Sequence, residues 1–223
     1  MILKIKNLKI PDIAPLNFEI SENGLYGLIG RNGIGKSTLF GILSGEIGFS
    51  QGEIENGRVA YLPDVESFEE SLKMHDYFKI LKNSEQDRAR ELSLTFGADK
   101  FAKKRIGQFS LGMKELFATI LSFSIDCDIL IIDELFSGLD VSKKALVYEE
   151  VKKIAQEKIV LLTSHNLKEI EHFCDQAYLL SEKGLTLVTN FDEAAKEIGY
   201  MDVFFSEREL MRKNTTLFGL YIF

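Results

Sequence analysis

The sequence has few of the residues that mark unusual structural classes. Its 223 residues include only two cysteines, three prolines and no tryptophan. Cys127 and Cys174 lie far apart, with no Cys or His at ligand spacing, so neither a disulfide framework nor a zinc site is indicated and we expect both in the interior. With 45% hydrophobic and 27% charged residues, the composition is that of an ordinary globular protein rather than a disordered one.

Long apolar runs are also missing. Segments such as Ile129–Ile132 and Ile159–Leu162 fall far short of the ~20 residues that cross a bilayer. At the start of the chain, apolar Leu3 and Ile5 alternate with lysines, which predicts a half-buried strand rather than a signal peptide. We therefore expect a cytoplasmic chain that does not span a membrane by itself.

An excess of positive charge is missing as well. Lys and Arg number 27 against 34 Asp and Glu, which gives a net charge of −7. Proteins that bind nucleic acids through the phosphate backbone are normally basic, so no nucleic-acid partner is expected. One local anion site remains compatible with this balance.

The kind of sequence pattern changes along the chain. Strand-like segments dominate residues 1–62, and the last two, Glu53–Glu55 and Arg58–Leu62, are joined by Asn56-Gly57, which predicts a tight hairpin. From about Ser67 to Ser124 helical spacing replaces the β-branched runs, which predicts a helical insert. The other strands expected in the first part are Leu3–Ile5, Leu16–Ile20 and Leu25–Ile29.

After the insert, strands and helices alternate. We expect strands at Asp128–Ile132, Ile159–Thr163, Ala177–Leu180 and Leu185–Thr189, and helices at Val141–Gln156 and Leu167–Phe173. Apolar strands that alternate with amphipathic helices call for a largely parallel sheet covered on both faces. The fold class is therefore α/β.

The strongest motif is a phosphate-binding loop. Residues 30–37 read G-R-N-G-I-G-K-S, which fits G-x-x-x-x-G-K-[ST] between an apolar strand and a helical stripe that Gly45 can end. Backbone N–H groups of such a loop can point at a β-phosphate, while Lys36 supplies charge for the β and γ oxygens and Ser37 offers its hydroxyl to Mg²⁺. The expected nucleotide-binding residues are Gly30, Arg31, Asn32, Gly33, Ile34, Gly35, Lys36, Ser37 and Thr38.

A pair of carboxylates follows the apolar segment that begins at Asp128. Asp133 and Glu134 stand at its carboxyl end, where ligands of open α/β sheets bind. Neighbouring residues of a strand point to opposite sides, so the two carboxylates serve different purposes. We assign Asp133 to the Mg²⁺ shell and Glu134 to the attacking water as general base.

A histidine follows a second apolar strand. His165 comes after Ile159–Thr163 and is expected on the same sheet edge as the phosphate loop, where its imidazole can donate a hydrogen bond to a γ-phosphate. His75 and His172 lack such a setting, and we interpret them as surface or packing residues.

Taken in order, these segments resemble the nucleotide-binding subunit of an ATP-binding cassette (ABC) ATPase. Phe109-Ser110-Leu111-Gly112-Met113-Lys114 looks like the signature segment of that family, and Ser137-Gly138-Leu139-Asp140 is similar to its D-loop. The resemblance covers roughly residues 1–190 and implies a P-loop NTPase core, an N-terminal antiparallel β subdomain and an inserted α-helical subdomain. It places one ATPase domain in residues 1–199, with the helical subdomain at about 67–124, and leaves residues 200–223 as a tail of unknown role.

The resemblance also implies partners and an activity. ATP on one protomer would be capped in trans by Ser110, Leu111 and Gly112 of a second ABC ATPase subunit, in a homodimer or a heterodimer. Hydrolysis of ATP would drive a separate transmembrane permease subunit, which would hold the chain at the inner face of the cell membrane. ATP and Mg²⁺ are the implied cofactors.

The sequence departs from the family pattern at several positions. Its signature reads FSLGM rather than LSGGQ, a variant that resembles the ATPase subunits of exporters for peptides, antibiotics or other amphiphiles. Asp64 stands where the family usually has a glutamine, and it can still approach Mg²⁺. No aromatic residue lies near Ile10 to Ile13 to stack on adenine, so GTP is an alternative nucleotide; we interpret Phe18 and Tyr26 as packed strand residues.

The favoured hypothesis is thus the ATPase subunit of an ABC exporter. Two alternatives stay open: an ABC-type ATPase that serves a cytosolic assembly, and a regulator that binds nucleotide with little turnover. The sequence identifies neither the cargo nor the membrane partner, and it leaves open whether the apolar end of the chain is a docking surface or an intramolecular cover.

Overall fold

The computed structural model describes residues 2–61, 65–134, 138–164 and 166–199. The chain forms two compact units, Met1–Leu187 and Val188–Phe223. The second unit contains helix α7 (Phe191–Glu197), which the Asn190 side chain caps by accepting the Asp192 N–H at 3.0 Å. The predicted division between residues 199 and 200 stays a prediction.

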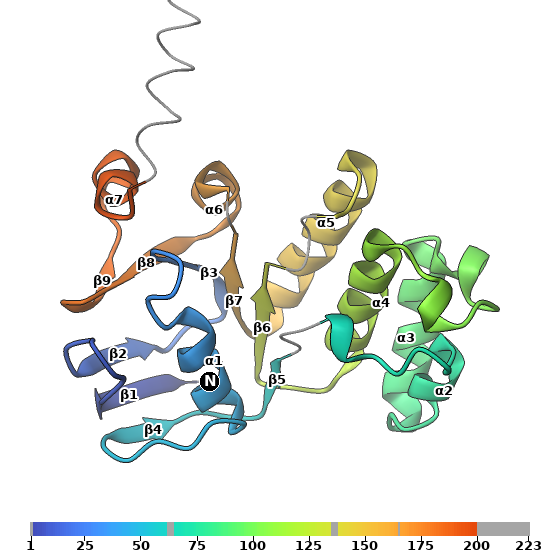
Figure 1. The fold of residues 1–223 in the computed structure, drawn as a ribbon, viewed down its shortest axis with the longest axis horizontal. Coiled ribbons are helices and arrows are strands. Elements are labelled where there is room, and N and C mark those ends of the chain that lie inside the picture. The colour runs from blue at the N-terminus through green and yellow to red at the C-terminus, as the bar shows by residue number, and fades with distance from the viewer. Residues whose placement is uncertain (1, 62–64, 135–137, 165, 200–223) are drawn as a thin grey trace, which may run out of the picture. The chain divides into compact units, whose positions relative to one another are not determined.

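The first unit is built around a six-stranded sheet (Figure 1). All neighbouring strands run parallel except β9, which is antiparallel to β8. The predicted parallel sheet is therefore confirmed, and the strand that precedes the phosphate loop, β3, lies between two others in the interior of the sheet. In sheet order the strands are β5 (Val59–Tyr61), β6 (Ile129–Asp133), β7 (Ile159–Thr163), β3 (Gly24–Ile29), β8 (Gln176–Ser181) and β9 (Gly184–Leu187).

A separate three-stranded sheet is antiparallel and has the order β2 (Leu16–Ile20), β1 (Leu3–Leu8), β4 (Glu53–Glu55). The predicted hairpin at Asn56-Gly57 is wrong, because β4 pairs with β1 whereas β5 joins the other sheet. Gly57 serves a close approach instead: a Cβ atom there would stand 2.4 Å from Asp128 Oδ2, which accepts the Arg58 N–H at 2.7 Å.

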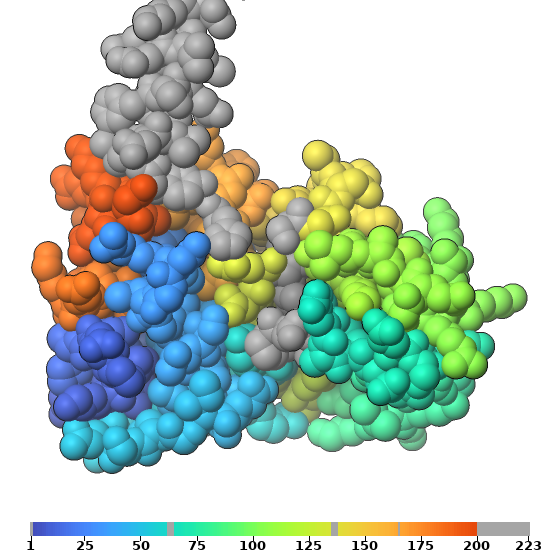
Figure 2. Space-filling model, in the orientation of Figure 1, coloured from blue at the N-terminus to red at the C-terminus, as the bar shows by residue number. Residues whose placement is uncertain are grey.

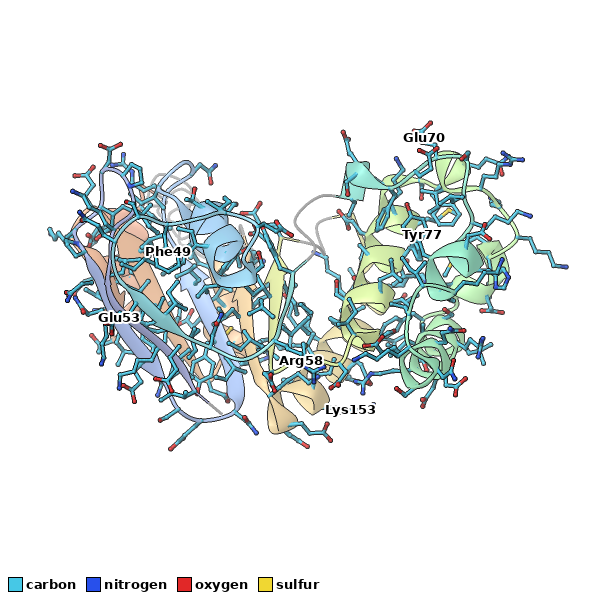
Figure 3. The ribbon with its side chains drawn as sticks, turned by 90° about the horizontal axis from the view of Figure 1, so that it is seen from below. Phe49, Glu53, Arg58, Glu70, Tyr77 and Lys153 are labelled. Carbon is cyan, nitrogen blue, oxygen red and sulfur yellow. The ribbon has the colours of Figure 1, made fainter. Side chains whose placement is uncertain are left out.

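The predicted helical insert is confirmed. It contains α2 (Met74–Phe78), α3 (Asn83–Thr95) and α4 (Leu111–Ser124), with 3₁₀ turns at Val65–Ser67, Ala98–Phe101 and Ile106–Gln108. Phe117 is fully buried, and its ring centre lies 4.9 Å from that of Phe68 and 5.4 Å from that of Tyr77. Figure 3 shows Tyr77 among the helices of the insert. An aromatic core of its own thus holds the insert together. In the space-filling view of Figure 2 the insert, in teal and green, lies at the right.

Three more helices pack on the parallel sheet: α1 (Lys36–Ser44), α5 (Val141–Glu157) and α6 (Leu167–Phe173). Gly45 ends α1 with φ 82°, a conformation that favours glycine. A Cβ atom on Gly27 of β3 would meet Ile170 Cγ2 at 2.3 Å, so this glycine lets α6 approach the sheet closely. None of the helices in the described residues has the length and apolar character needed to cross a membrane.

Candidate functional site

The carboxyl ends of four parallel strands meet at one edge of the sheet. β3 leads into the phosphate loop, β6 into the acid pair, β7 into Ser164, and β5 ends at Tyr61. Ligands of open α/β sheets bind at such an edge. The sheet therefore brings together motifs that lie more than 100 residues apart in the sequence.

The phosphate loop wraps between β3 and α1. Gly33 and Gly35 have φ values of 78° and 110°, and Gly35 directly precedes the first residue of the helix. The Lys36 ammonium group donates to the Gly30 carbonyl at 2.9 Å and to the Arg31 carbonyl at 3.3 Å. The lysine thus folds back over the loop, and its charge lies beside the start of α1, where the helix dipole also attracts anions.

The remaining predicted loop residues divide into outward and inward positions. Arg31 and Asn32 are exposed, as is Ser37, whereas Ile34 packs partly against the hydrophobic core and Thr38 is half-buried. The exposed face of the loop is therefore polar, while its apolar residue anchors it.

Asp133 is the residue on which the elements of this edge converge. The Ser37 hydroxyl donates to Asp133 Oδ2 at 3.1 Å, which brings together the two residues predicted to bind Mg²⁺. Tyr61 donates its hydroxyl to the same oxygen at 3.2 Å, and Thr163 donates to Oδ1 at 2.6 Å. Burial, reinforced by the Asp133 carboxylate, raises the pKa of Tyr61, so its hydroxyl stays a protonated donor.

Glu134 has an unusual backbone. It is half-buried and has φ 57°, in the left-handed region that residues other than glycine rarely adopt. Such a conformation costs about 1–3 kcal/mol and is concentrated at functional sites. The proposed base is therefore held in a strained turn directly after β6 rather than in strand geometry.

Three predicted site residues, Asp64, Ser137 and His165, lie outside the described residues. Beside the position of the histidine, Ser164 donates its hydroxyl to Glu169 Oε2 at 2.7 Å, and Tyr148 donates to the same oxygen at 3.1 Å. Burial, followed by the Glu169 carboxylate, raises the pKa of Tyr148. The end of β7 is thus attached to α5 and α6 by hydrogen bonds.

The signature segment forms the start of α4. Ser110 caps this helix, because its hydroxyl oxygen accepts the Met113 N–H at 3.3 Å. Leu111, the first residue of the helix, is 56% exposed. The segment therefore presents a hydroxyl, a helix N-terminus and an apolar side chain at the surface.

The signature segment contacts the segment that follows the acid pair. A Cβ atom on Gly112 would lie 2.6 Å from the Gly138 carbonyl oxygen, and the Gly138 N–H donates to Glu115 Oε2 at 2.8 Å. Leu139 is buried, and Asp140 caps α5 by accepting the Lys143 N–H at 2.9 Å. The Ser142 hydroxyl and then the Lys143 N–H hold the pKa of Asp140 below its ordinary value.

Sequence reasoning missed three of these residues: Tyr61, Thr163 and Glu115. A usable signal existed for the first two, since both are hydroxyl-bearing residues at the carboxyl ends of predicted strands. For Glu115 the signal was weak, a charged residue just before the apolar run of its helix, and this residue is 4% exposed.

The oxygen donors at this edge fit Mg²⁺. Mg²⁺ prefers oxygen ligands and is usually held by one or two carboxylates, substrate phosphates and water. Ser37 and Asp133 supply a hydroxyl and a carboxylate that already touch. In the part of the chain that the structure describes, no group of three or more His, Cys, Asp or Glu residues could hold a metal by itself. A cation here would therefore depend on the phosphates for its remaining ligands.

Aliphatic residues cover the amino end of α1. A Cβ atom on Gly35 would lie 3.4 Å from Ile13 Cδ1 and 3.5 Å from Ile10 Cγ2, and both isoleucines are buried. Tyr26 is buried in the core and Phe18 packs half-buried against it, as predicted, and the Phe18 ring meets Tyr178 edge-on at 4.9 Å.

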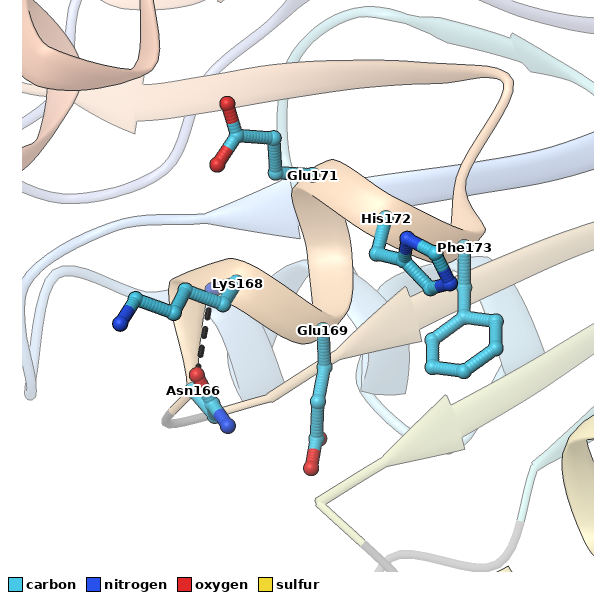
Figure 4. Close-up of a pocket in the computed structure, with 6 residues that line it drawn as sticks. All are labelled: Asn166, Lys168, Glu169, Glu171, His172 and Phe173. Carbon is cyan, nitrogen blue, oxygen red and sulfur yellow. Dashed lines mark hydrogen bonds between the residues drawn. The ribbon is translucent and has the colours of Figure 1, made fainter. Parts of the chain in front are cut away.

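A pocket of about 460 Å³ lies away from the phosphate loop, along α6 (Figure 4). It is lined by Asn166, Lys168, Glu169, Glu171, His172 and Phe173. His172, interpreted as a surface or packing residue, meets the Phe173 ring edge-on at 4.8 Å. Of the predicted catalytic and nucleotide-binding residues that the structure describes, none lines this pocket.

Comparison with known proteins gives one consistent result. The sequence model of a family described as "ABC transporter" matches residues 13–137. An uncharacterized ABC transporter ATP-binding protein of Methanocaldococcus jannaschii is 29% identical over 196 residues, which cover 84% of this chain and 75% of the relative. The lantibiotic transport ATP-binding protein SrtF of Streptococcus pyogenes is 26% identical over 227 residues, 92% of this chain and 99% of the relative.

The fold has solved counterparts too. One is described as the structure of the ATP binding subunit of an ABC transporter; it superposes with a TM-score of 0.78 at 21% identity and covers 89% of this chain and 100% of its own. At that identity the likeness concerns the fold.

Proposed function

This chain belongs to the ABC transporter family, as an ATP-binding subunit whose ATPase activity is coupled to transport, and from this premise we propose that it powers an exporter for a peptide, an antibiotic or another amphiphile. The signature variant FSLGM supports the exporter assignment, and so does the likeness to a lantibiotic transport protein over nearly the whole chain. The observation that carries the proposed chemistry is the convergence of Ser37 and Asp133, 3.1 Å apart, beside the Lys36 loop.

In the proposed binding mode, the triphosphate lies on the loop of residues 30–37. The backbone N–H groups of this loop, the start of α1 and the Lys36 ammonium group neutralise the β- and γ-phosphates. Lys36 would exchange its bonds to the Gly30 and Arg31 carbonyls for bonds to phosphate oxygens. Ser37 and Asp133 would hold Mg²⁺, with Asp64 as a further candidate, and the cation would neutralise charge on the β and γ oxygens.

In the proposed hydrolysis, Glu134 acts as the general base. Its carboxylate takes a proton from water while the water oxygen attacks the γ-phosphorus and the bridging oxygen leaves with ADP. His165 would donate a hydrogen bond to the γ-phosphate. The strained backbone of Glu134 supports this assignment, because the surrounding structure keeps that residue in a backbone conformation with an energetic cost.

The proposed active form is a head-to-tail dimer. Ser110, Leu111 and Gly112 of one protomer would cap the ATP bound to the other, with the hydroxyl and the amino end of α4 directed at the γ-phosphate. The 56% exposure of Leu111 supports an interface at this position. Residues Ser137 to Asp140 would join the same interface, since Gly138 contacts Gly112.

ATPase subunits of this family pair with a membrane permease. We propose that the helical insert and the segment after Asp64 receive a cytoplasmic part of that permease, so that the chain lies at the inner face of the membrane. Co-purification from membranes and identification of the bound polytopic protein tests the pairing. Recovery with soluble assembly factors alone would favour the cytosolic alternative.

Glu134→Gln tests the chemistry. A general base contributes about 100-fold or more to the rate, so ATP turnover should fall by at least that factor while an ATP-dependent dimer becomes stable in size-exclusion chromatography. Glu157→Gln, at the exposed end of α5, is a matched control and should behave as the unaltered chain. Equal turnover in Glu134→Gln and the unaltered chain would reject Glu134 as the base.

Lys36→Ala tests the phosphate loop separately. This variant should lose affinity for a fluorescent ATP analogue, because the loop would keep its backbone donors but lose its only ammonium group. Unchanged binding of the analogue would reject the loop as the nucleotide site.

A further inference from the structure

The Asp133 carboxylate is held from both of its oxygens. Thr163 donates to Oδ1 at 2.6 Å and Tyr61 donates to Oδ2 at 3.2 Å. The two donors come from the strands on either side of β6: Thr163 is the residue paired with Asp133 in β7, and Tyr61 ends β5. The carboxylate is thus fixed by the register of three neighbouring strands.

Both donors are themselves fixed in place. Thr163 is 2% exposed, so bulk water has little access to replace its hydroxyl. The Tyr61 ring is half-buried and packs edge-on against Phe40 of α1, with 5.8 Å between ring centres. Loss of the Thr163 hydroxyl would therefore remove this donor from Oδ1, and loss of the Tyr61 hydroxyl would leave Oδ2 to Ser37, a proposed Mg²⁺ ligand.

The two donors differ from Ser37 in an important respect. Ser37 also donates to Asp133 Oδ2, but it is itself a proposed ligand of Mg²⁺. Tyr61 and Thr163 both donate to Asp133, and neither is a proposed ligand of Mg²⁺. Their hydroxyls can therefore hold the carboxylate without taking a place in the Mg²⁺ shell.

We propose that Tyr61 and Thr163 are positioning residues that orient the Asp133 carboxylate and thereby set the Mg²⁺ affinity of the nucleotide site. This inference rests on the proposed function, because it assumes that Mg²⁺ accompanies the nucleotide at Ser37 and Asp133. Groups that hydrogen-bond a metal ligand fix its orientation, and their loss commonly costs about 10- to 100-fold in metal affinity or activity.

The test uses the full chain with Tyr61→Phe and Thr163→Val, which remove one hydroxyl each and keep the shape of the side chain. Binding of a fluorescent ATP analogue is measured in EDTA and then across a Mg²⁺ titration. We expect the Mg²⁺ concentration for half-maximal effect to rise about tenfold or more in each variant. Affinity for the analogue in EDTA should stay within about twofold of the unaltered chain, because neither residue belongs to the phosphate loop.

Two controls make the result specific. Thr163→Ser keeps the hydroxyl and should retain the Mg²⁺ dependence of the unaltered chain. Tyr26→Phe removes a hydroxyl that donates to the Glu22 carbonyl at 3.0 Å, away from Asp133, and should leave the titration unchanged. A parallel titration with Mn²⁺ in place of Mg²⁺ follows binding directly, through the fall in the electron paramagnetic resonance signal of the free ion.

The possible failures can be told apart. If Mg²⁺ does not alter nucleotide binding by the unaltered chain, the proposed function and this inference are overturned together. If the unaltered chain depends on Mg²⁺ and both Tyr61→Phe and Thr163→Val follow the same curve, only the inference is overturned. Weakened Mg²⁺ dependence in Thr163→Ser, equal to that in Thr163→Val, would also overturn it, because the hydroxyl would then not be the cause.

Discussion

Gly112 approaches the carbonyl oxygen of Gly138 so closely that a Cβ atom on Gly112 would stand 2.6 Å from it. The other polar backbone group of Gly138, its N–H, donates to Glu115 Oε2 at 2.8 Å. Both polar groups of Gly138 therefore face α4. As a result, the start of the signature helix and the segment that follows the acid pair are in direct contact.

Gly112→Ala tests the steric part of this contact. The added methyl group would meet a backbone oxygen, which cannot move aside as the end of a flexible side chain can, so α4 and Gly138 must separate. We expect a loss of about 1–3 kcal/mol in the free energy of unfolding and a marked loss of ATP turnover, with binding of a fluorescent ATP analogue retained. Gly48→Ala is the matched control, since nothing lies within 4 Å of a Cβ atom there. Unaltered stability and turnover in Gly112→Ala would contradict the close contact.

Glu115 tests the polar part of the same contact. Glu115→Leu should destabilise the chain by about 1–3 kcal/mol, because it leaves the Gly138 N–H without this acceptor in a setting where Glu115 is 4% exposed. Glu115→Gln keeps an acceptor oxygen and should lose much less. Thermal or denaturant unfolding of both variants measures the difference. Equal stability of the two would indicate that the hydrogen bond to Gly138 contributes nothing.

The site residues that the sequence predicted belong to local motifs, whereas the missed ones depend on contacts between segments that are distant in the sequence. The phosphate loop, the acid pair and the strand Ile159–Thr163 are visible in local patterns, because glycine spacing and apolar runs are properties of short segments. The contact of Thr163 with Asp133 depends on strand register across 30 residues, which no local pattern contains. Tyr61 meets Asp133 for the same reason, through pairing of β5 with β6.

The wrong hairpin has a related cause. Asn56-Gly57 between two strands has the local chemistry of a tight turn. The two strands do not pair with each other, however, because β4 pairs with β1 and β5 pairs with β6. Here Gly57 makes room for Asp128, and Asn56 donates its side-chain amide to the Leu43 carbonyl at 2.9 Å. Both residues of the dipeptide thus serve contacts between distant segments.

Glu85 predicts a dependence of stability on pH. Its carboxylate accepts the Asp126 N–H at 3.0 Å and the Lys82 N–H at 2.9 Å, and these bonds, the first above all, hold its pKa below the ordinary value against the opposing effect of burial. A carboxylate with a lowered pKa stabilises the folded state above its ordinary pKa, and this contribution is lost as the pH falls through the lowered pKa.

Glu85→Gln should therefore be less stable than the unaltered chain by about 1–3 kcal/mol near pH 7, and the difference should shrink below a pH of about 4.5. Denaturant unfolding across this pH range measures it. Glu91→Gln, on the exposed face of the same helix, is the control and should show no such trend. A difference that stays constant down to pH 3 would contradict the assigned hydrogen bonds.

Alkylation of the two cysteines can serve as a chemical probe of unfolding. Burial raises the pKa of the Cys174 thiol to about 12, and it raises the pKa of Cys127 as well, although Lys158 opposes the effect there. Because the thiolate is the reactive form, both residues should resist alkylation by iodoacetamide at pH 8 in the folded chain. Mass spectrometry should find no adduct before unfolding and two adducts in guanidinium chloride. Cys127 is buried as expected, whereas Cys174 is half-buried and its sulfur lies 3.3 Å from where a Cβ atom on Gly27 would stand. Rapid modification of Cys174 in the native chain would contradict the packing of its sulfur against β3.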